Sequence, residues 1–135
     1  MRPKRLEARS GCPVELTVAV IGGVWKPTIL YHLLVNGKLR FMALSRAIPE
    51  ATQRMLALQL RELEADGIVI RHVFPEVPPR VEYELTPVGK TLGALLRDLR
   101  NWGTRYREVR GLDQGGGFPD CPPGAAHTAP PSDAA

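Results

Sequence analysis

The sequence predicts a mainly helical α+β fold, because helical patterns surround one short pair of strand patterns. Between Leu39 and Leu85, two short helical patterns separated by a tight break come first. Two strand patterns joined by a proline-rich connection follow them. Further helical patterns stand before and after this stretch. The order of elements is that of a winged helix-turn-helix with an added helix at each end.

The two helical patterns before Leu39 have clear starts and ends. Pro13 suits the first turn of a helix, and the pair Gly22-Gly23 ends the apolar stretch that follows it. The next pattern runs from about Trp25 to Val35 and ends at Asn36-Gly37. Its spacing predicts a buried side made of Ile29, Leu30, Leu33 and Leu34.

The predicted helix-turn-helix begins after a short extended piece at residues 38–40. Phe41–Ala47 form a brief helix that stops before Pro49. Thr52 is a good N-cap for the second helix, which we expect to end at Gly67. Helical geometry predicts that one side of it is buried, formed by Leu56, Leu60 and Leu63. The opposite side holds two arginines around a small apolar patch: Arg54, Ala57, Leu58 and Arg61.

Residues 68–74 and 81–85 are predicted strands, and three prolines stiffen the connection between them. This connection places Arg80 at the tip of the hairpin. The alternation directs three residues toward the core: Val81, Tyr83 and Leu85. Thr86 and Pro87 then fit the start of one last helix. Its apolar residues recur every three or four positions: Val88, Leu92, Leu95, Leu96, Leu99 and Trp102.

Composition divides the chain into three expected parts. Residues 1–11 are basic and lack apolar periodicity, so we expect a flexible arm. Residues 12–108 form the folded domain, and residues 109–135, rich in glycine, proline and alanine, are expected to be a disordered tail. Lysine and arginine outnumber aspartate and glutamate by 18 to 14. The only charged residues among the last 25 are aspartates. The rest of the chain is therefore more basic than the total suggests, which suits a polyanion as a partner.

Several classes of protein are not expected. No apolar run approaches the roughly 20 residues that cross a bilayer, and no apolar stretch follows the basic start, so neither a membrane protein nor a secreted one is indicated. Cys12 and Cys121 lie at opposite ends, which favours a reducing cytoplasm over a disulfide framework. The sequence lacks the common catalytic motifs, so we expect no enzyme. His32, His72 and His127 share no ligand spacing, so we expect neither a metal nor a cofactor.

Four segments of the chain form a recognisable pattern: CPVELTVAVIGGVWKPTIL, RFMALSRAIPEAT, LQLRELEADGIVIRHVFPEVPPRVEYELTPVGK and a closing NWG. In these segments, which span about residues 12–103, the chain closely resembles the HxlR-type family of bacterial winged-helix transcription regulators. The resemblance implies a homodimer that places one recognition helix per subunit in the major groove of a palindromic operator. It also implies regulation, often repression, in response to oxidants, electrophiles or small ligands.

The resemblance and the residues together indicate which side chains contact double-stranded DNA. Lys38 and Arg40 match positions where the family touches phosphates, and Arg80 matches the wing. Ala57 and Leu58 replace residues that are usually polar, so they can meet only a thymine methyl group. The complete expected set is Lys38, Arg40, Thr52, Gln53, Arg54, Ala57, Leu58, Arg61 and Arg80.

The expected dimer interface lies on the first and last helices: Val14, Val18, Leu92, Leu95, Leu96, Leu99 and Trp102. Cys12 is open to two interpretations. It is either a small residue packed beside a helix start, or a redox-sensing thiol activated by the helix N-terminus and the basic arm. The resemblance includes redox sensors with a cysteine at this position. Cys121 is either incidental or the residue that resolves oxidised Cys12 as a disulfide.

Other interpretations stay open. Two arginines could form ion pairs inside the protein in place of DNA contacts, at little energetic gain. The alternative partners are Glu62 or Glu64 for Arg61, and Glu76 or Glu82 for Arg80. For the whole protein, the alternatives are a ligand-sensing regulator like those of the MarR family and a winged helix used only for protein contacts.

Overall fold

A computed structural model of the chain describes residues 11–112. The expectations for residues 1–10 and 113–135, including the role of Cys121, lie outside this range. The helices are α2 (Pro13–Ile21), α3 (Lys26–Asn36), α4 (Phe41–Ala47), α5 (Gln53–Ala65), α6 (Pro87–Lys90) and α7 (Gly93–Arg110). The strands are β1 (Lys38–Arg40), β2 (Val69–Phe74) and β3 (Arg80–Leu85). The predicted mainly helical α+β class is confirmed.

The sheet has three antiparallel strands in the order β1-β3-β2, although the sequence predicts only the β2–β3 hairpin. The short piece at residues 38–40 also pairs with β3, with Lys38 opposite Glu84 and Arg40 opposite Glu82. Opposite charges that face each other across two strands favour this register. Three residues are too few to show alternation, so the sequence does not reveal the pairing. β1 thereby ties the start of α4 to the hairpin, which forms the wing.

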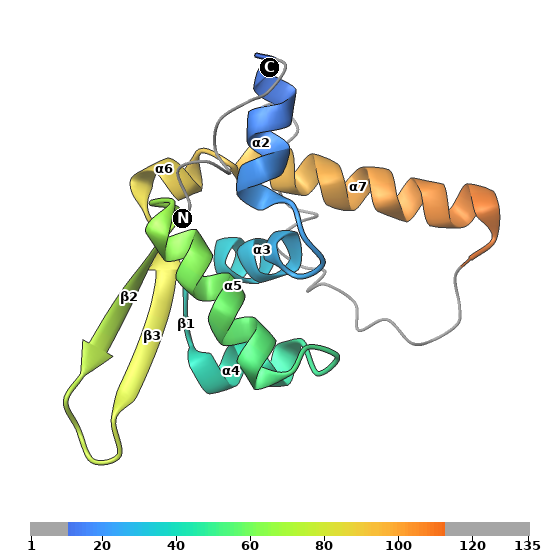
Figure 1. Cartoon of the computed structure of the whole chain (residues 1–135). Helices are drawn as coiled ribbons and strands as arrows, with labels where there is room; N and C mark the ends of the chain where they lie inside the picture. The colour runs from blue at the N-terminus through green and yellow to red at the C-terminus, as the bar shows by residue number, and fades with distance from the viewer. Residues whose placement is uncertain (1–10, 113–135) are drawn as a thin grey trace.

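The core lies around α3, which crosses the centre of the molecule (Figure 1). The predicted buried side of α5 is confirmed, since its three inward leucines are almost completely buried. Their burial fixes which side of α5 faces outward. The largest fully buried side chains are Ile29, Leu30, Leu33, Leu44, Ile48, Leu56, Leu60, Leu63, Val69 and Leu96.

The last helical segment is two helices, and the prediction of a single one is wrong. Thr86 caps α6 as predicted, because its Oγ1 accepts a hydrogen bond of 2.9 Å from the N–H of Gly89. Gly89 packs directly on the carbonyl oxygen of Ile68, where a Cβ atom would collide, so α6 is fixed against the sheet. The N–H groups of Thr91 and Leu92 then bond three residues back, which tightens the turn and ends α6.

α7 divides into an inner and an outer half. Leu96 is only 2% exposed and belongs to the core of its own chain, and Leu92 and Leu95 pack partly against that core. The outer half projects away from the body, on the side opposite the wing (Figure 1). α7 ends at Arg110, two residues beyond the predicted end of the domain, and Gly111 caps it in a left-handed conformation.

α2 and α3 are separate helices joined through Gly22-Gly23, as the sequence predicts. In the range 11–112 no single helix is both long and apolar enough to cross a membrane. α2 and α3 reach the required length and apolar content only when counted as one segment, and that segment bends by 78° at the break between the two helices.

Candidate nucleic-acid interface

The outward side of α5 is the centre of the candidate interface. Arg54, Leu58 and Arg61 are exposed there, with Leu58 45% exposed, and Ala57 is half-buried beside them. Leu58 is thus an apolar side chain in contact with solvent, between the two charged side chains Arg54 and Arg61. The surface offers two guanidinium groups to base edges or phosphates, and one apolar contact between them.

The start of α5 is a second possible contact point. The side chain of Thr52 accepts a hydrogen bond of 3.0 Å from the N–H of Met55, so its predicted capping role is present. The other N–H groups of this first turn have no partner within the helix, and a helix N-terminus attracts phosphate. Gln53 follows the cap and is exposed, where its amide can reach a base edge.

The two glutamates of α5 pair with bases from other elements. α5 holds two arginines and two glutamates, so its formal charge is zero. Glu62 Oε1 lies 2.6 Å from Lys26 Nζ, and Glu64 Oε1 lies 3.5 Å from Arg71 Nε. Among the described residues, no ion pair joins Arg61 to either glutamate, so that alternative is not what the structure shows. The outward side of α5 is therefore positive although the helix as a whole is neutral.

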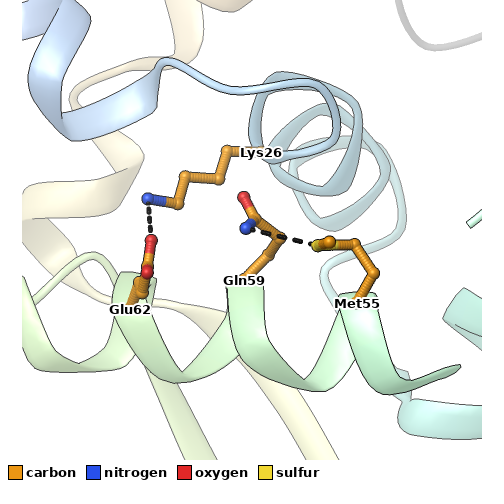
Figure 2. A network of polar contacts seen from close by, with 4 residues as sticks. All are labelled: Lys26, Met55, Gln59 and Glu62. Carbon is orange, nitrogen blue, oxygen red and sulfur yellow. Dashed lines mark hydrogen bonds and ion pairs between the residues drawn. The ribbon is translucent and has the colours of Figure 1, made fainter. Parts of the chain in front are cut away.

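Figure 2 shows the side of α5 that faces the start of α3. Lys26 reaches across from α3 to Glu62, and Gln59 Nε2 donates a hydrogen bond of 3.7 Å to Met55 Sδ. Lys26 is 3% exposed, which is rare for a lysine unless it is paired. The sequence analysis missed this residue because nothing local distinguishes a buried lysine at a helix start from a solvated one.

Arg80 lies at the base of the wing loop, so its predicted place at the tip is wrong. It is the first residue of β3 and pairs with Phe74, the last residue of β2. Its Nη2 is 3.2 Å from Glu76 Oε2, and its Nε is 3.3 Å from Glu82 Oε2. Both alternative ion pairs of Arg80 are therefore present. A phosphate would have to compete with these two carboxylates for Arg80.

The other wing bases are more open. Lys38 and Arg40 on β1 are exposed, and Arg40 Nε is 3.9 Å from Glu82 Oε2. On the neighbouring strands, His72 Nε2 lies 2.8 Å from Glu84 Oε2, and this hydrogen bond is the main cause that lowers the pKa of Glu84. Both outward glutamates of β3 thus have basic neighbours, which limits their repulsion of a polyanion.

Cys12 and the first helix lie apart from this surface. Cys12 is the N-cap residue of α2 and is exposed, so its thiol lies outside the core of the chain. Val14 and Val18 on α2 are also exposed. Both are apolar side chains on the surface of a helix of nine residues.

The predicted interface residues on α7 separate into two groups. Leu96 is buried in its own chain and is removed from the expected interface, whereas Leu99 is exposed and Trp102 is 63% exposed. The sequence analysis did not single out Tyr106, whose ring stacks on Trp102 with centroids 5.0 Å apart. Its spacing of four residues from Trp102 was the available signal.

A cavity of about 160 Å³ opens beside this stretch, between α3 and α7. Leu99 and Arg100 line it from α7, and Tyr31 lines it from α3. Pockets for drug-sized ligands usually measure about 300–1,000 Å³. The cavity is therefore small for such a ligand.

Residues 20–110 match the family model described as HxlR-like helix-turn-helix. YybR of Bacillus subtilis (strain 168), described as an uncharacterized HTH-type transcriptional regulator, is 54% identical over 101 residues. The match covers 75% of this chain and 80% of YybR.

Solved structures show the same similarity. The redox regulator HypR in its reduced form has a TM-score of 0.70 and 51% identity, and the match covers 75% of this chain and 99% of HypR. The reduced form of the transcriptional regulator YodB from B. subtilis has a TM-score of 0.59 and 35% identity. That match covers 73% of this chain and 96% of YodB.

Proposed function

The chain belongs to the HxlR-like helix-turn-helix family, and from this premise we propose that it is a homodimeric repressor that binds a palindromic operator and responds to oxidants. It is a helix-turn-helix transcriptional regulator of a DNA-binding family. The dimer, the repression, the operator and the effector are the proposal. Because it acts on chromosomal DNA, we place it in the cytoplasm.

The observation that carries the proposal is the charge distribution of α5. The two glutamates pair with Lys26 and Arg71, and the outward side keeps Arg54 and Arg61 around Leu58. A helix of this kind fits the major groove, where arginine reads guanine and an apolar side chain meets a thymine methyl group. Lys38, Arg40 and Arg80 supply backbone contacts at the sides, Thr52 supplies one at the helix start, and Gln53 beside it reads a base edge.

A dimer is supported by the apolar surface on the far side of the chain. α2 exposes Val14 and Val18, and the outer half of α7 exposes Leu99 and Trp102. A monomer rarely leaves such a surface in water. Two copies joined through these helices would present two recognition helices to the two halves of a palindrome.

For the effector, we favour an oxidant or electrophile over a small ligand. Cys12 is exposed at the start of α2, on the proposed dimer helix, and the cavity beside α7 is small for a typical ligand. Chemistry at Cys12 would change the helix that holds the two subunits together. Treatment with diamide should abolish operator binding by the parent and spare Cys12→Ser. Equal loss of binding in both proteins would exclude Cys12 as the sensor.

The proposed function is tested by mapping bound genomic sites and titrating the protein against one of them in increasing salt. We expect a palindrome, a preference for it over random DNA of the same length, and affinity that falls steeply with salt. Binding without sequence preference would favour a winged helix used for protein contacts. If a small molecule releases the Cys12→Ser variant from DNA as well as the parent, a ligand-sensing regulator like those of the MarR family is favoured.

A further inference from the structure

One lysine outside the elements proposed to face DNA is buried. Lys26 lies in the first turn of α3, where its side chain is almost completely enclosed. Taking an ammonium group out of water is strongly unfavourable unless a partner compensates for it. The partner here is Glu62 on α5, 36 positions later in the chain, and the contact of 2.6 Å is a charge-assisted hydrogen bond.

Glu62 stands at the edge of the surface proposed to face DNA. It follows Arg61 directly and lies four residues after Leu58, so it is the next side chain along the helix from Leu58. Its side chain is 29% exposed, between the protein and solvent. A carboxylate that turned outward from this position would repel phosphate and attract the neighbouring guanidinium groups.

We propose that Lys26 is a positioning residue for DNA recognition. Its ammonium group holds the carboxylate of Glu62 against α3, so that α5 presents Arg54 and Arg61 to DNA with no competing acid turned toward them. The proposal rests on the proposed function, because it concerns the same surface of α5. Lys26 does not touch DNA itself, but it controls the charge of the surface that DNA meets.

Two further residues of α5 lie beside this pair. Gln59 and Met55 lie on the same side of α5 as Glu62, and Figure 2 shows all three facing the start of α3. Gly23, in the link before α3, lies beside Gln59: an added Cβ atom would sit 3.4 Å from its Oε1, at van der Waals contact. The segment that leads into Lys26 therefore packs on the row that contains Glu62.

The test compares Lys26→Met, Glu62→Gln and the double variant by fluorescence anisotropy, on an operator and on random DNA, at several salt concentrations. Lys26→Met should weaken binding to both DNAs on the order of tenfold and flatten the salt dependence, because the ammonium group of Lys26 no longer balances the charge of Glu62 beside the phosphates. Glu62→Gln should bind at least as well as the parent. The double variant should recover most of the loss.

Arg105→Gln is the matched control. It removes one positive charge from an exposed site on α7, away from α5, so the change in affinity should be about twofold or less. If Lys26→Met and the double variant bind equally weakly, Lys26 acts only on the structure and the proposal is overturned. The proposal is also overturned if Lys26→Met binds like the parent.

Two further comparisons keep the outcomes separate. If Lys26→Met does not unfold cooperatively on heating, Lys26→Gln, whose neutral amide attracts the carboxylate of Glu62 less than an ammonium group does, is compared with Lys26→Gln/Glu62→Gln. The double variant should bind more tightly, and equal affinities of these two overturn the proposal. If the parent shows no preference for operator DNA, the proposed function itself fails. If the parent prefers the operator and only the rescue is absent, this inference fails alone.

Discussion

The guanidinium group of Arg80 stacks on the ring of Phe74, 4.1 Å from its centroid, and these two residues are the last pair of the β2–β3 ladder. The stacking holds Arg80 at the base of the wing loop, between the carboxylates of Glu76 and Glu82. The wing arginine is thus oriented before DNA arrives, and part of its charge is compensated.

Replacing Arg80 by alanine should weaken binding to all sequences by a similar factor. A wing contact to the backbone contributes no base preference, so the salt slope should fall by about one while the ratio of operator to random DNA stays constant. Glu76→Gln should act in the opposite direction, because it removes one competitor for the guanidinium group. A salt slope for Arg80→Ala equal to that of the parent would show that Arg80 serves the wing alone.

Arg54→Ala should reduce the preference for the operator. A guanidinium group at the first turn of α5 can bond guanine in the major groove, and its loss should cost about 1–3 kcal/mol of specific binding. Arg105→Ala on α7 removes the same charge from an exposed site away from α5 and should leave the preference unchanged. Similar effects of the two variants on operator and random DNA would indicate only a general electrostatic role for Arg54.

Leu58 makes a different kind of prediction, because it can contact DNA only through apolar atoms. If it lies against a thymine methyl group, an operator in which uracil replaces thymine should bind more weakly by about 1 kcal/mol, roughly the value of one buried methyl group. Leu58→Ala should bind the two operators equally. If Leu58→Ala and the parent lose the same affinity when uracil replaces thymine, another residue reads the methyl group.

Local signals explain which parts of the fold the sequence predicts well. Pro13 and Thr52 mark helix starts through backbone chemistry within one turn, and Gly67 marks a helix end in the same way. The buried side of α5 follows from helical periodicity alone. The break between α6 and α7 lies instead where the N–H groups of Thr91 and Leu92 bond three residues back, and the spacing of the apolar residues does not distinguish this tightened turn from a continuous helix.

The same distinction applies to the candidate site. Arg54, Leu58 and Arg61 are predictable because their positions follow from the inward leucines of the same helix. Whether they carry an uncompensated charge depends on Lys26 and Arg71, which reach α5 from other elements. Side chains of glutamate are long enough to turn to either side of a helix, so sequence spacing leaves their partners undetermined.

If the outer half of α7 lies in the dimer interface, Trp102 should contribute strongly to the stability of the dimer. Trp102→Asp should destabilise the dimer by about 2–4 kcal/mol, because an exposed tryptophan that stacks on Tyr106 and becomes buried in the dimer is a typical interface hot spot. Sedimentation at several concentrations measures the change. Asn101→Asp adds the same charge to the adjacent exposed position and should leave the dimer intact. Identical sedimentation of both variants would place the interface elsewhere.

Buried His32 predicts how stability changes with pH. The side chain is 7% exposed, and its burial lowers its pKa from the usual 6.5, so the folded chain keeps it neutral where the unfolded chain binds a proton. The free energy of unfolding should therefore fall as the pH drops below 6.5, by at most about 1.4 kcal/mol per pH unit. The lowered pKa of Glu84 acts in a separate window, because its contribution is lost only below its usual 4.5. Urea titrations of the parent and of His32→Gln between pH 7.5 and 5.5 isolate the His32 contribution, since His72 is present in both proteins. Parallel pH profiles for the two would show that His32 does not stay neutral in the folded chain.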